Sequence, residues 1–110
     1  MTSDPLPPPI ARYFAGKNAG DFGTGLAGFS ESAVVQDEGH RHEGPAAIRA
    51  WMEETSARYN DKAEIKRAAR NGDEIEVTAQ ILGTFPGSPI TLRFRFTLEG
   101  DRIARLEIES

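Results

Sequence analysis

The feature that most constrains the fold of this chain is a change in the spacing of its apolar residues near Asn60. Before Asn60, apolar side chains recur every three or four residues, which is the pattern of helices that bury one face. After Asn60 they alternate with polar side chains, which is the pattern of strands with one buried face. Helices followed by strands in close succession predict an α+β fold, in which helices cover one face of a mainly antiparallel sheet.

Three helices are predicted in the first half of the chain. The first becomes regular near Ile10, because the prolines at positions 7–9 make its first turn irregular. Asp21 can cap the second, a glycine-rich helix whose apolar face extends to Phe29. The Gly-Pro pair at positions 44–45 begins the third helix. The stripe on this third helix comprises Ile48, Trp51, Met52, Thr55 and Tyr59.

Two short strands, over residues 33–37 and 40–42, are predicted between the second and third helices. In the second half of the chain, Asn71-Gly72 is a strong signal for a hairpin turn between two longer strands. The last strand is predicted over residues 102–108. One face of each successive longer strand is formed by Ala63, Ile65, Arg67 and Ala69, then by Ile75, Val77, Ala79 and Ile81, then by Ile90, Leu92, Phe94, Phe96 and Leu98.

At 110 residues and 12.0 kDa, the chain is predicted to form a single domain over residues 1–110. Hydrophobic residues make up 38% of it, which supports a real but modest core. A second copy of the chain would add buried surface, so we expect a homodimer. The outer face of one long strand, with Thr91, Arg93, Arg95 and Thr97, is the face that we expect to meet this partner.

Charge and composition exclude several classes of function. The net charge is −4 and no cluster of Lys and Arg is interleaved with aromatic residues, so we expect no nucleic-acid partner. Cysteine is absent, which excludes disulfides and thiolate catalysis. No segment has the length of a membrane span, and the first five residues lack the features of a signal peptide. We therefore expect a cytoplasmic protein without membrane association.

Tyr13 and Asp37 are the strongest candidates for a catalytic pair. A compact fold can bring the helix-borne phenol and the strand-borne carboxylate into one pocket. Removal of a proton next to a carbonyl group requires a base, a pocket that excludes water and a hydrogen-bond donor for the oxygen that gains charge. Two structural alternatives remain open: Tyr13 can be a core residue beside Phe14, and Asp37 can stabilise the following loop through an Asx turn.

His40 and His42 are expected on one face of a short strand, with the carboxylates of Asp37, Glu38 and Glu43 nearby. This grouping is a reason to consider a metal site. Three ligands in suitable geometry are not evident, and we expect no metal. His40 is the third candidate catalytic residue, because the titration range of histidine suits an acid or a base.

Four segments are informative in combination: Ala11-Arg12-Tyr13, Asn18-Ala19-Gly20-Asp21, residues 29–37 and residues 44–51. Together they resemble the ketosteroid isomerase and SnoaL-like polyketide cyclase branches of the nuclear transport factor 2 superfamily. The resemblance extends over nearly the whole chain in the order of its elements. It implies a cone-shaped fold, in which N-terminal helices pack in the concave face of a curved, mainly antiparallel sheet around an apolar pocket.

The separation of Tyr13 and Asp37 is the most specific part of this resemblance. In ketosteroid isomerases, a Tyr and an Asp at the same separation act as oxyanion donor and proton-shuttling base, and the resemblance implies these roles for Tyr13 and Asp37. The second acid of that oxyanion hole corresponds to Phe94 in this chain. Phenylalanine offers no hydrogen-bond donor, so we expect a poor ketosteroid isomerase.

The resemblance implies a protein that binds a small lipophilic molecule and is an enzyme of the SnoaL-like or ketosteroid isomerase-like branch. We expect isomerisation, cyclisation or dehydration of a lipophilic carbonyl compound, with Asp37 as the base and no cofactor. The alternative is a non-catalytic domain for lipophilic-ligand binding or dimerisation on the same fold. The expected pocket residues are Phe14, Trp51, Val77, Leu92, Phe94, Leu106 and Ile108.

Overall fold

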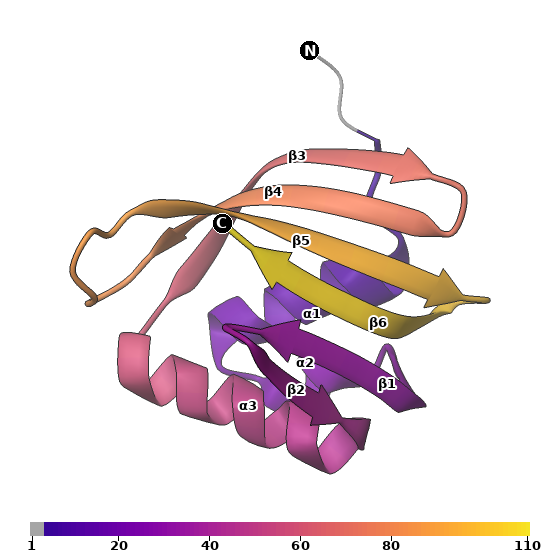
Figure 1. The fold of residues 1–110 in the computed structure, drawn as a ribbon, viewed down its shortest axis with the longest axis horizontal. Helices are drawn as coiled ribbons and strands as arrows, with labels where there is room; N and C mark the ends of the chain where they lie inside the picture. The colour runs from indigo at the N-terminus through magenta and orange to yellow at the C-terminus, as the bar shows by residue number, and fades with distance from the viewer. Residues whose placement is uncertain (1–3) are drawn as a thin grey trace.

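Six strands form one curved sheet, in the order β2-β1-β6-β5-β4-β3, in the computed structural model, which describes residues 4–110 (Figure 1). β1 and β6 run parallel, and every other neighbouring pair in the sheet is antiparallel. The elements are α1 (Pro8–Ala19), α2 (Phe22–Leu26), β1 (Phe29–Asp37), β2 (His40–Glu43), α3 (Gly44–Tyr59), β3 (Lys62–Asn71), β4 (Glu74–Leu82), β5 (Ile90–Glu99) and β6 (Arg102–Glu109).

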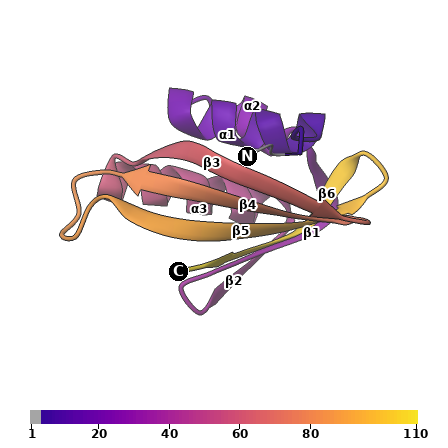
Figure 2. The same cartoon turned by 90° about the horizontal axis from the view of Figure 1, so that it is seen from above.

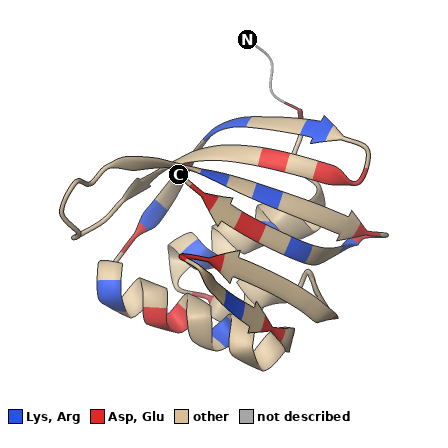
Figure 3. Cartoon of the chain, viewed as in Figure 1, with Lys and Arg blue, Asp and Glu red and all other residues tan. Residues whose placement is uncertain are grey.

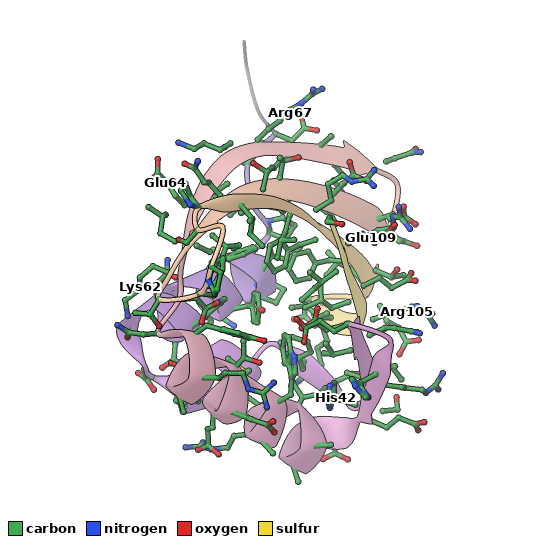
Figure 4. The ribbon with its side chains drawn as sticks, turned by 60° about the vertical axis from the view of Figure 1, so that its left-hand side comes forward. His42, Lys62, Glu64, Arg67, Arg105 and Glu109 are labelled. Atoms are coloured by element: carbon green, nitrogen blue, oxygen red, sulfur yellow. The ribbon has the colours of Figure 1, made fainter. Side chains whose placement is uncertain are left out.

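The helices of the described residues lie on the concave side of this sheet. Figure 2 shows α1 and α2 as a layer beside the sheet, and Figure 4 shows the sheet arching over the helices. Side chains between the arch and the helices form the core, in which Tyr13, Phe94 and Phe96 are among the largest fully buried members. The predicted α+β fold, with helices in the concave face of a curved and mainly antiparallel sheet, is confirmed.

The first two helices begin where the sequence supplies suitable residues. α1 begins at Pro8, slightly before the predicted Ile10, because proline has a helical φ and the first turn needs no backbone donor. Gly20 ends α1 with a left-handed φ of 74°. The Asp21 side chain accepts a hydrogen bond of 3.3 Å from the backbone N–H of Thr24 and caps α2, as predicted.

The predicted second helix is wrong at its C-terminal end. α2 ends at Leu26, and Phe29 belongs to β1. The carbonyl of Gly28 accepts a hydrogen bond of 2.8 Å from the N–H of Ile103, and Phe29 pairs with Ile103 in the parallel β1–β6 ladder. Strand pairing therefore overrides the helical spacing of Phe29, and β1 begins there rather than at residue 33.

α3 begins at Gly44 as predicted and continues for 16 residues. Its Ile48, Trp51 and Met52 side chains are buried. Asn60 ends the helix with a left-handed φ of 46°. None of the helices among residues 4–110 has the length and apolar character needed to cross a lipid bilayer.

The predicted face of β3 is wrong after Ile65. A bulge between Ile65 and Arg67 shifts the alternation, so that Ala68 is buried while Arg67 and Ala69 are exposed. Ile65 itself is 38% exposed. One extra residue in a strand moves every later side chain to the opposite face, and the sequence pattern carries no sign of it.

The strands that follow lie close to their predicted positions. β3 and β4 are joined by a tight turn in which Gly72 adopts a φ of 65°. All four predicted inward residues of β4 are buried. Phe94, Phe96 and Leu98 of β5 are also buried, whereas Ile90 is 39% exposed at the start of the strand.

Candidate active site

A cavity of about 50 Å³, termed the inner chamber, lies between α1, α3 and the concave face of the sheet. Tyr13 of α1 and Asp37 at the end of β1 both lie on its wall, so the fold brings the two predicted residues to one cavity. The residues that line the inner chamber are Tyr13, Lys17, Asp37, Trp51, Met52, Thr55, Asp61, Ile81, Leu92, Phe94 and Ile108.

Tyr13 is both a core residue and a cavity residue. It is 1% exposed, and its ring stacks on that of Trp51 with centroids 6.4 Å apart. Phe29 and Phe96 meet the ring edge-on, each at 5.8 Å. These aromatic contacts restrict the ring, so the position of the hydroxyl is fixed by packing.

The Tyr13 hydroxyl has no hydrogen-bond partner among residues 4–110, although the residue lines the inner chamber. Burial raises the pKa of Tyr13 well above its ordinary value, and the negative charges of Asp37 and Asp61 raise it further. The phenol therefore stays protonated at neutral pH. It can donate a hydrogen bond to an oxygen atom that gains negative charge in the chamber.

Asp37 is half-buried, and Nε1 of Trp51 donates a hydrogen bond of 3.1 Å to its Oδ2 atom. Burial is the largest influence and raises the pKa of Asp37 above its ordinary value, while the hydrogen bond from Trp51 lowers it. Nearby Glu38 and Asp61 raise this pKa further, and His42 lowers it. A carboxylate with a raised pKa is a stronger base than an exposed aspartate.

A second cavity of about 270 Å³, termed the outer chamber, shares part of its wall with the inner chamber. Its own wall is formed mainly by Tyr59 and Phe85, whose rings meet edge-on at 5.7 Å, and by the half-exposed Ile90. Pockets for small molecules typically have volumes of about 300–1,000 Å³, so the two chambers together suit a compact ligand. The residues that line both chambers are Asp37, Thr55, Asp61, Ile81 and Leu92.

A buried ion pair of Lys17 and Asp61 also lies on the cavity wall. Lys17 Nζ lies 2.5 Å from Asp61 Oδ2, and the two side chains are only 12% and 6% exposed. Next to this pair, the side-chain amide of Asn18 donates to the carbonyl of Ala63 and accepts from its N–H, both at 2.8 Å. These bonds join the end of α1 to the start of β3 and hold Lys17 against Asp61.

Lys17 and Asp61 were not among the residues predicted for the site. Lys17 did give a signal, because it follows Tyr13 by one helical turn and places a charge on an apolar stripe. Asp61 gave none, because it follows the end of α3 like an ordinary polar loop residue. Their contact joins positions 44 apart, which local spacing cannot indicate.

The predicted pocket residues divide into two groups. Trp51, Leu92, Phe94 and Ile108 line the inner chamber, whereas the other three form the packed core around it. Phe14, for example, lies edge-on against Phe94 at 5.2 Å. The three core residues are Phe14, Val77 and Leu106.

Phe94 lines the inner chamber at the position where the resemblance led us to expect a second acid. It is 1% exposed, and its ring centroid lies 6.5 Å from that of Tyr13. The phenyl ring supplies no donor to this part of the chamber. Weak ketosteroid isomerase activity therefore stays a prediction with a clear physical cause.

His40 and His42 lie outside the inner chamber. They line a polar groove of about 360 Å³ on another side of Asp37, where His40 is exposed and the His42 ring lies 5.9 Å from that of Trp51. Figure 4 shows His42 at the β2 edge of the arch. A role for His40 as acid or base within the inner chamber is therefore not supported by its position. Among residues 4–110, no group of three His, Asp or Glu side chains is arranged to hold a metal.

Comparisons with known proteins agree with this architecture. A family model described as the SnoaL-like domain matches residues 10–106. The crystal structure of a proposed polyketide cyclase from Sinorhizobium meliloti is 39% identical, with a TM-score of 0.92 over 94% of this chain and 95% of that chain.

Two more distant structures share the fold. An uncharacterised protein of cystatin fold from Novosphingobium aromaticivorans is 24% identical, with a TM-score of 0.79 over 93% of this chain and 95% of that chain. A protein with a ketosteroid isomerase-like fold from Catenulispora acidiphila, solved in complex with trimethylamine, is 19% identical, with a TM-score of 0.85 over 96% and 87% of the two chains. Among curated proteins, none matches the sequence.

Proposed function

The chain belongs to the SnoaL-like domain family, and from this premise we propose that it is a cofactor-independent enzyme that moves a proton next to the carbonyl group of a compact lipophilic compound. Asp37 is the base and Tyr13 is the donor to the carbonyl oxygen. The observation that carries the proposal is that both side chains lie on the wall of one cavity. The remainder of that wall is largely apolar, as a lipophilic ligand requires.

The protonation states of the two residues suit these roles. The carboxylate of Asp37 removes a proton from the carbon next to the carbonyl group, and the electron pair of the broken C–H bond moves toward the carbonyl oxygen. The protonated hydroxyl of Tyr13 donates a hydrogen bond to that oxygen and stabilises the enolate. Because burial raises the pKa of Asp37, the carboxyl group can hold the proton until the next step.

Three outcomes of one enolate account for the three reaction types of the proposal. Return of the proton from Asp37 to a different carbon isomerises the substrate. Departure of a hydroxyl group from the neighbouring carbon, with the proton from Asp37, releases water and gives dehydration. Attack of the enolate carbon on a second carbonyl group of the same molecule gives cyclisation, and the proton then passes to the new alkoxide.

Non-catalytic binding of a lipophilic ligand is the second candidate function. Phe94 favours it, because its ring occupies a part of the wall where a second donor would stabilise the enolate. Loss of one such donor typically costs roughly 3 kcal/mol of transition-state stabilisation. The ligand of such a protein would fill the same two chambers, so exchange measurements are needed to separate the two functions.

Exchange of the protons next to the carbonyl group of 2-tetralone in D₂O tests the enzyme proposal. The rate is followed by proton NMR for the wild type, Asp37→Asn and Tyr13→Phe, with buffer alone as the background. We expect wild-type exchange above background, a loss of about a hundredfold or more in Asp37→Asn, and a loss of about a hundredfold in Tyr13→Phe.

Glu38→Gln is the matched control, because Glu38 is adjacent to Asp37, carries the same charge and lines the outer chamber and the polar groove but not the inner chamber. Its exchange rate should stay close to that of the wild type. Wild-type rates in Asp37→Asn would overturn the role of Asp37. Binding of 2-tetralone without any exchange above background would favour the binding function.

A further inference from the structure

The ion pair of Lys17 and Asp61 leaves one oxygen atom without a partner. Lys17 Nζ contacts Oδ2 of Asp61, whereas Oδ1 is buried and has no hydrogen-bond partner among residues 4–110. Asp61 as a whole is only 5% exposed. Folded proteins pair nearly all buried acceptors, because an unpaired one loses the hydrogen bonds that it makes in water. Oδ1 of Asp61 therefore has an unused capacity to accept a hydrogen bond.

The ion pair lies on the ligand cavity rather than elsewhere in the core. Asp61 lines both chambers, and Lys17 lines the inner one. The walls around them are apolar, with Met52, Ile81 and Leu92 among their members. A few placed polar groups in an apolar pocket are what orients a ligand.

Both charged groups are held from more than one side. Lys17 is carried by α1, and Asp61 directly follows Asn60, the residue that ends α3. The two hydrogen bonds between Asn18 and Ala63 join the same segments. The two charged side chains are already held in place before a ligand binds. A ligand group that fits the ion pair therefore binds without the cost of ordering these side chains.

We propose that the Lys17–Asp61 pair is the specificity-determining subsite for a hydroxyl group of the ligand. The hydroxyl hydrogen is donated to Oδ1 of Asp61, and the hydroxyl oxygen accepts a hydrogen bond from the Lys17 ammonium group. The substrate class is thus a mostly apolar, cyclic carbonyl compound with a hydroxyl group remote from the carbonyl. This inference rests on the proposed function for the placement of the carbonyl near Tyr13 and Asp37.

A neutral hydroxyl suits this subsite better than a charged group. A ligand carboxylate is attracted by Lys17 but repelled by Asp61, and a ligand ammonium group meets the reverse situation. A hydroxyl is both donor and acceptor, so it matches both members of the pair. A ligand without it leaves Oδ1 unpaired and binds more weakly.

The test compares 2-tetralone with its 5-, 6-, 7- and 8-hydroxy derivatives and with the matching methoxy compounds. Affinities are measured by NMR titration for the wild type and for Lys17→Met/Asp61→Leu, which replaces the ion pair by apolar side chains. We expect at least one hydroxy isomer to bind the wild type about tenfold or more tightly than 2-tetralone. Its methoxy counterpart, which cannot donate, should lose this gain.

In the double variant, the affinity for the hydroxy isomer should fall to that for 2-tetralone, so that the preference is lost. Replacement of a buried ion pair by apolar residues is commonly tolerated, and circular dichroism checks the fold. Lys66→Met/Glu64→Leu is the matched control, because this ion pair is half-exposed on β3 and lines neither chamber. It should retain the full preference.

A measurement on the unaltered protein keeps the proposal testable if the double variant does not fold. In the wild-type complex, the ring proton next to the hydroxyl should show nuclear Overhauser effects to the ε-methylene protons of Lys17. Contacts from that proton only to other residues would overturn the proposal. The proposal would also be overturned if no hydroxy isomer bound more tightly than 2-tetralone, or if no compound of the series bound at all. Retention of the preference by the folded double variant would overturn it as well.

The outcome is separable from that of the proposed function. Asp37→Asn should abolish proton exchange but keep the preference for the hydroxy isomer. A preference without exchange in the wild type supports the subsite and overturns the catalytic role. Exchange without any preference overturns the subsite alone.

Discussion

The pKa of Asp37 depends on burial and on one hydrogen-bond donor, Trp51. Burial raises this pKa, and the indole N–H of Trp51 lowers it by donating to the carboxylate at 3.1 Å. A base must be ionised to accept a proton, so the rate of proton removal rises with pH through the pKa of Asp37. The hydrogen bond from Trp51 therefore extends the pH range in which the proposed enzyme works to lower pH.

Trp51→Phe removes this hydrogen bond and leaves an aromatic ring in the chamber wall. Because the hydrogen bond stabilises the carboxylate, its loss raises the pKa of Asp37 further. The midpoint of the rising limb in the pH profile of 2-tetralone exchange should therefore move to higher pH. Phe14→Leu is the control, because the ring centroid of Phe14 lies 5.0 Å from that of Tyr13 and the ring gives no hydrogen bond to the Asp37 carboxylate. The midpoint of the pH profile of Phe14→Leu should equal that of the wild type. A midpoint in Trp51→Phe at or below the wild-type value would contradict this account.

At the scale of residues, sequence reasoning predicted Tyr13 and Asp37, which are one half of the proposed site. Tyr13 and Asp37 could be paired because a resemblance linked residues whose separation is fixed by one helix and one strand. Lys17 and Asp61 could not, because their contact depends on how the end of α3 and the start of β3 return to α1. Residues that belong to a family pattern can be predicted from the sequence. Contacts between residues far apart in the sequence can be recognised only once the fold is known.

At the scale of elements, α1 and α2 pack closely enough to exclude a side chain at their contact. A Cβ atom at Gly16 would lie 2.3 Å from the backbone nitrogen of Gly25 and 2.6 Å from the carbonyl oxygen of Asp21. Backbone atoms cannot move aside as a flexible side chain can. This contact positions the helix that carries Tyr13 and Lys17.

Gly16→Ala should therefore destabilise the protein by about 2 kcal/mol or more, as overpacked sites do. Helix propensity alone predicts the opposite sign, because alanine is favoured over glycine in a helix by roughly 1 kcal/mol. Gly23→Ala in α2 is the matched control, since its nearest neighbour would be an arginine side-chain atom 3.7 Å away, and it should be neutral or stabilising. Urea denaturation of both variants measures the free energies of unfolding. Equal stabilisation by the two substitutions would show that the contact is not tight.

At the scale of elements, local sequence patterns also failed to predict some strand boundaries and buried faces. The element order was predictable, because each helix and strand has a clear periodicity. Phe29 was assigned to a helix because its spacing fits one, but the parallel pairing with Ile103 of β6 places it in β1. The bulge after Ile65 likewise depends on β4, its pairing partner. The predicted start of β1 and the predicted buried face of β3 were therefore wrong because both depend on long-range strand pairing.

At the scale of the whole molecule, the convex side of the sheet carries charges in stripes. Figure 3 shows acidic segments on β4, basic segments on β5, and both acidic and basic segments on β6. Arg95 of β5 lies near the carboxylates of Glu74, Glu76 and Glu109, at 3.6, 3.9 and 3.1 Å. Figure 4 shows Arg105 directed away from the interior, as its place on this face requires. Exposed ion pairs of this kind add little to the stability of one chain.

We propose that two copies of the chain associate through this convex face. In a two-fold arrangement, the same patch meets itself, so an arginine of β5 in one chain can lie against the acidic stripes of the other. The modest core of a 110-residue chain makes the added burial useful. Sedimentation at micromolar concentration should show a two-chain species for the wild type.

Arg95→Glu tests the role of the stripes, because it places a fourth carboxylate beside the three that Arg95 contacts. Repulsion across the two-fold axis should then convert the dimer to a folded monomer in sedimentation, with circular dichroism as the check on the fold. Arg49→Glu makes the same change of charge on α3. There, Arg49 Nε lies 3.3 Å from Glu53 Oε2, so the substitution leaves the sheet unaltered, and the Arg49→Glu variant should remain dimeric. A wild type that stays monomeric at high concentration contradicts the assembly. A dimer that survives Arg95→Glu places the interface on another face of the molecule.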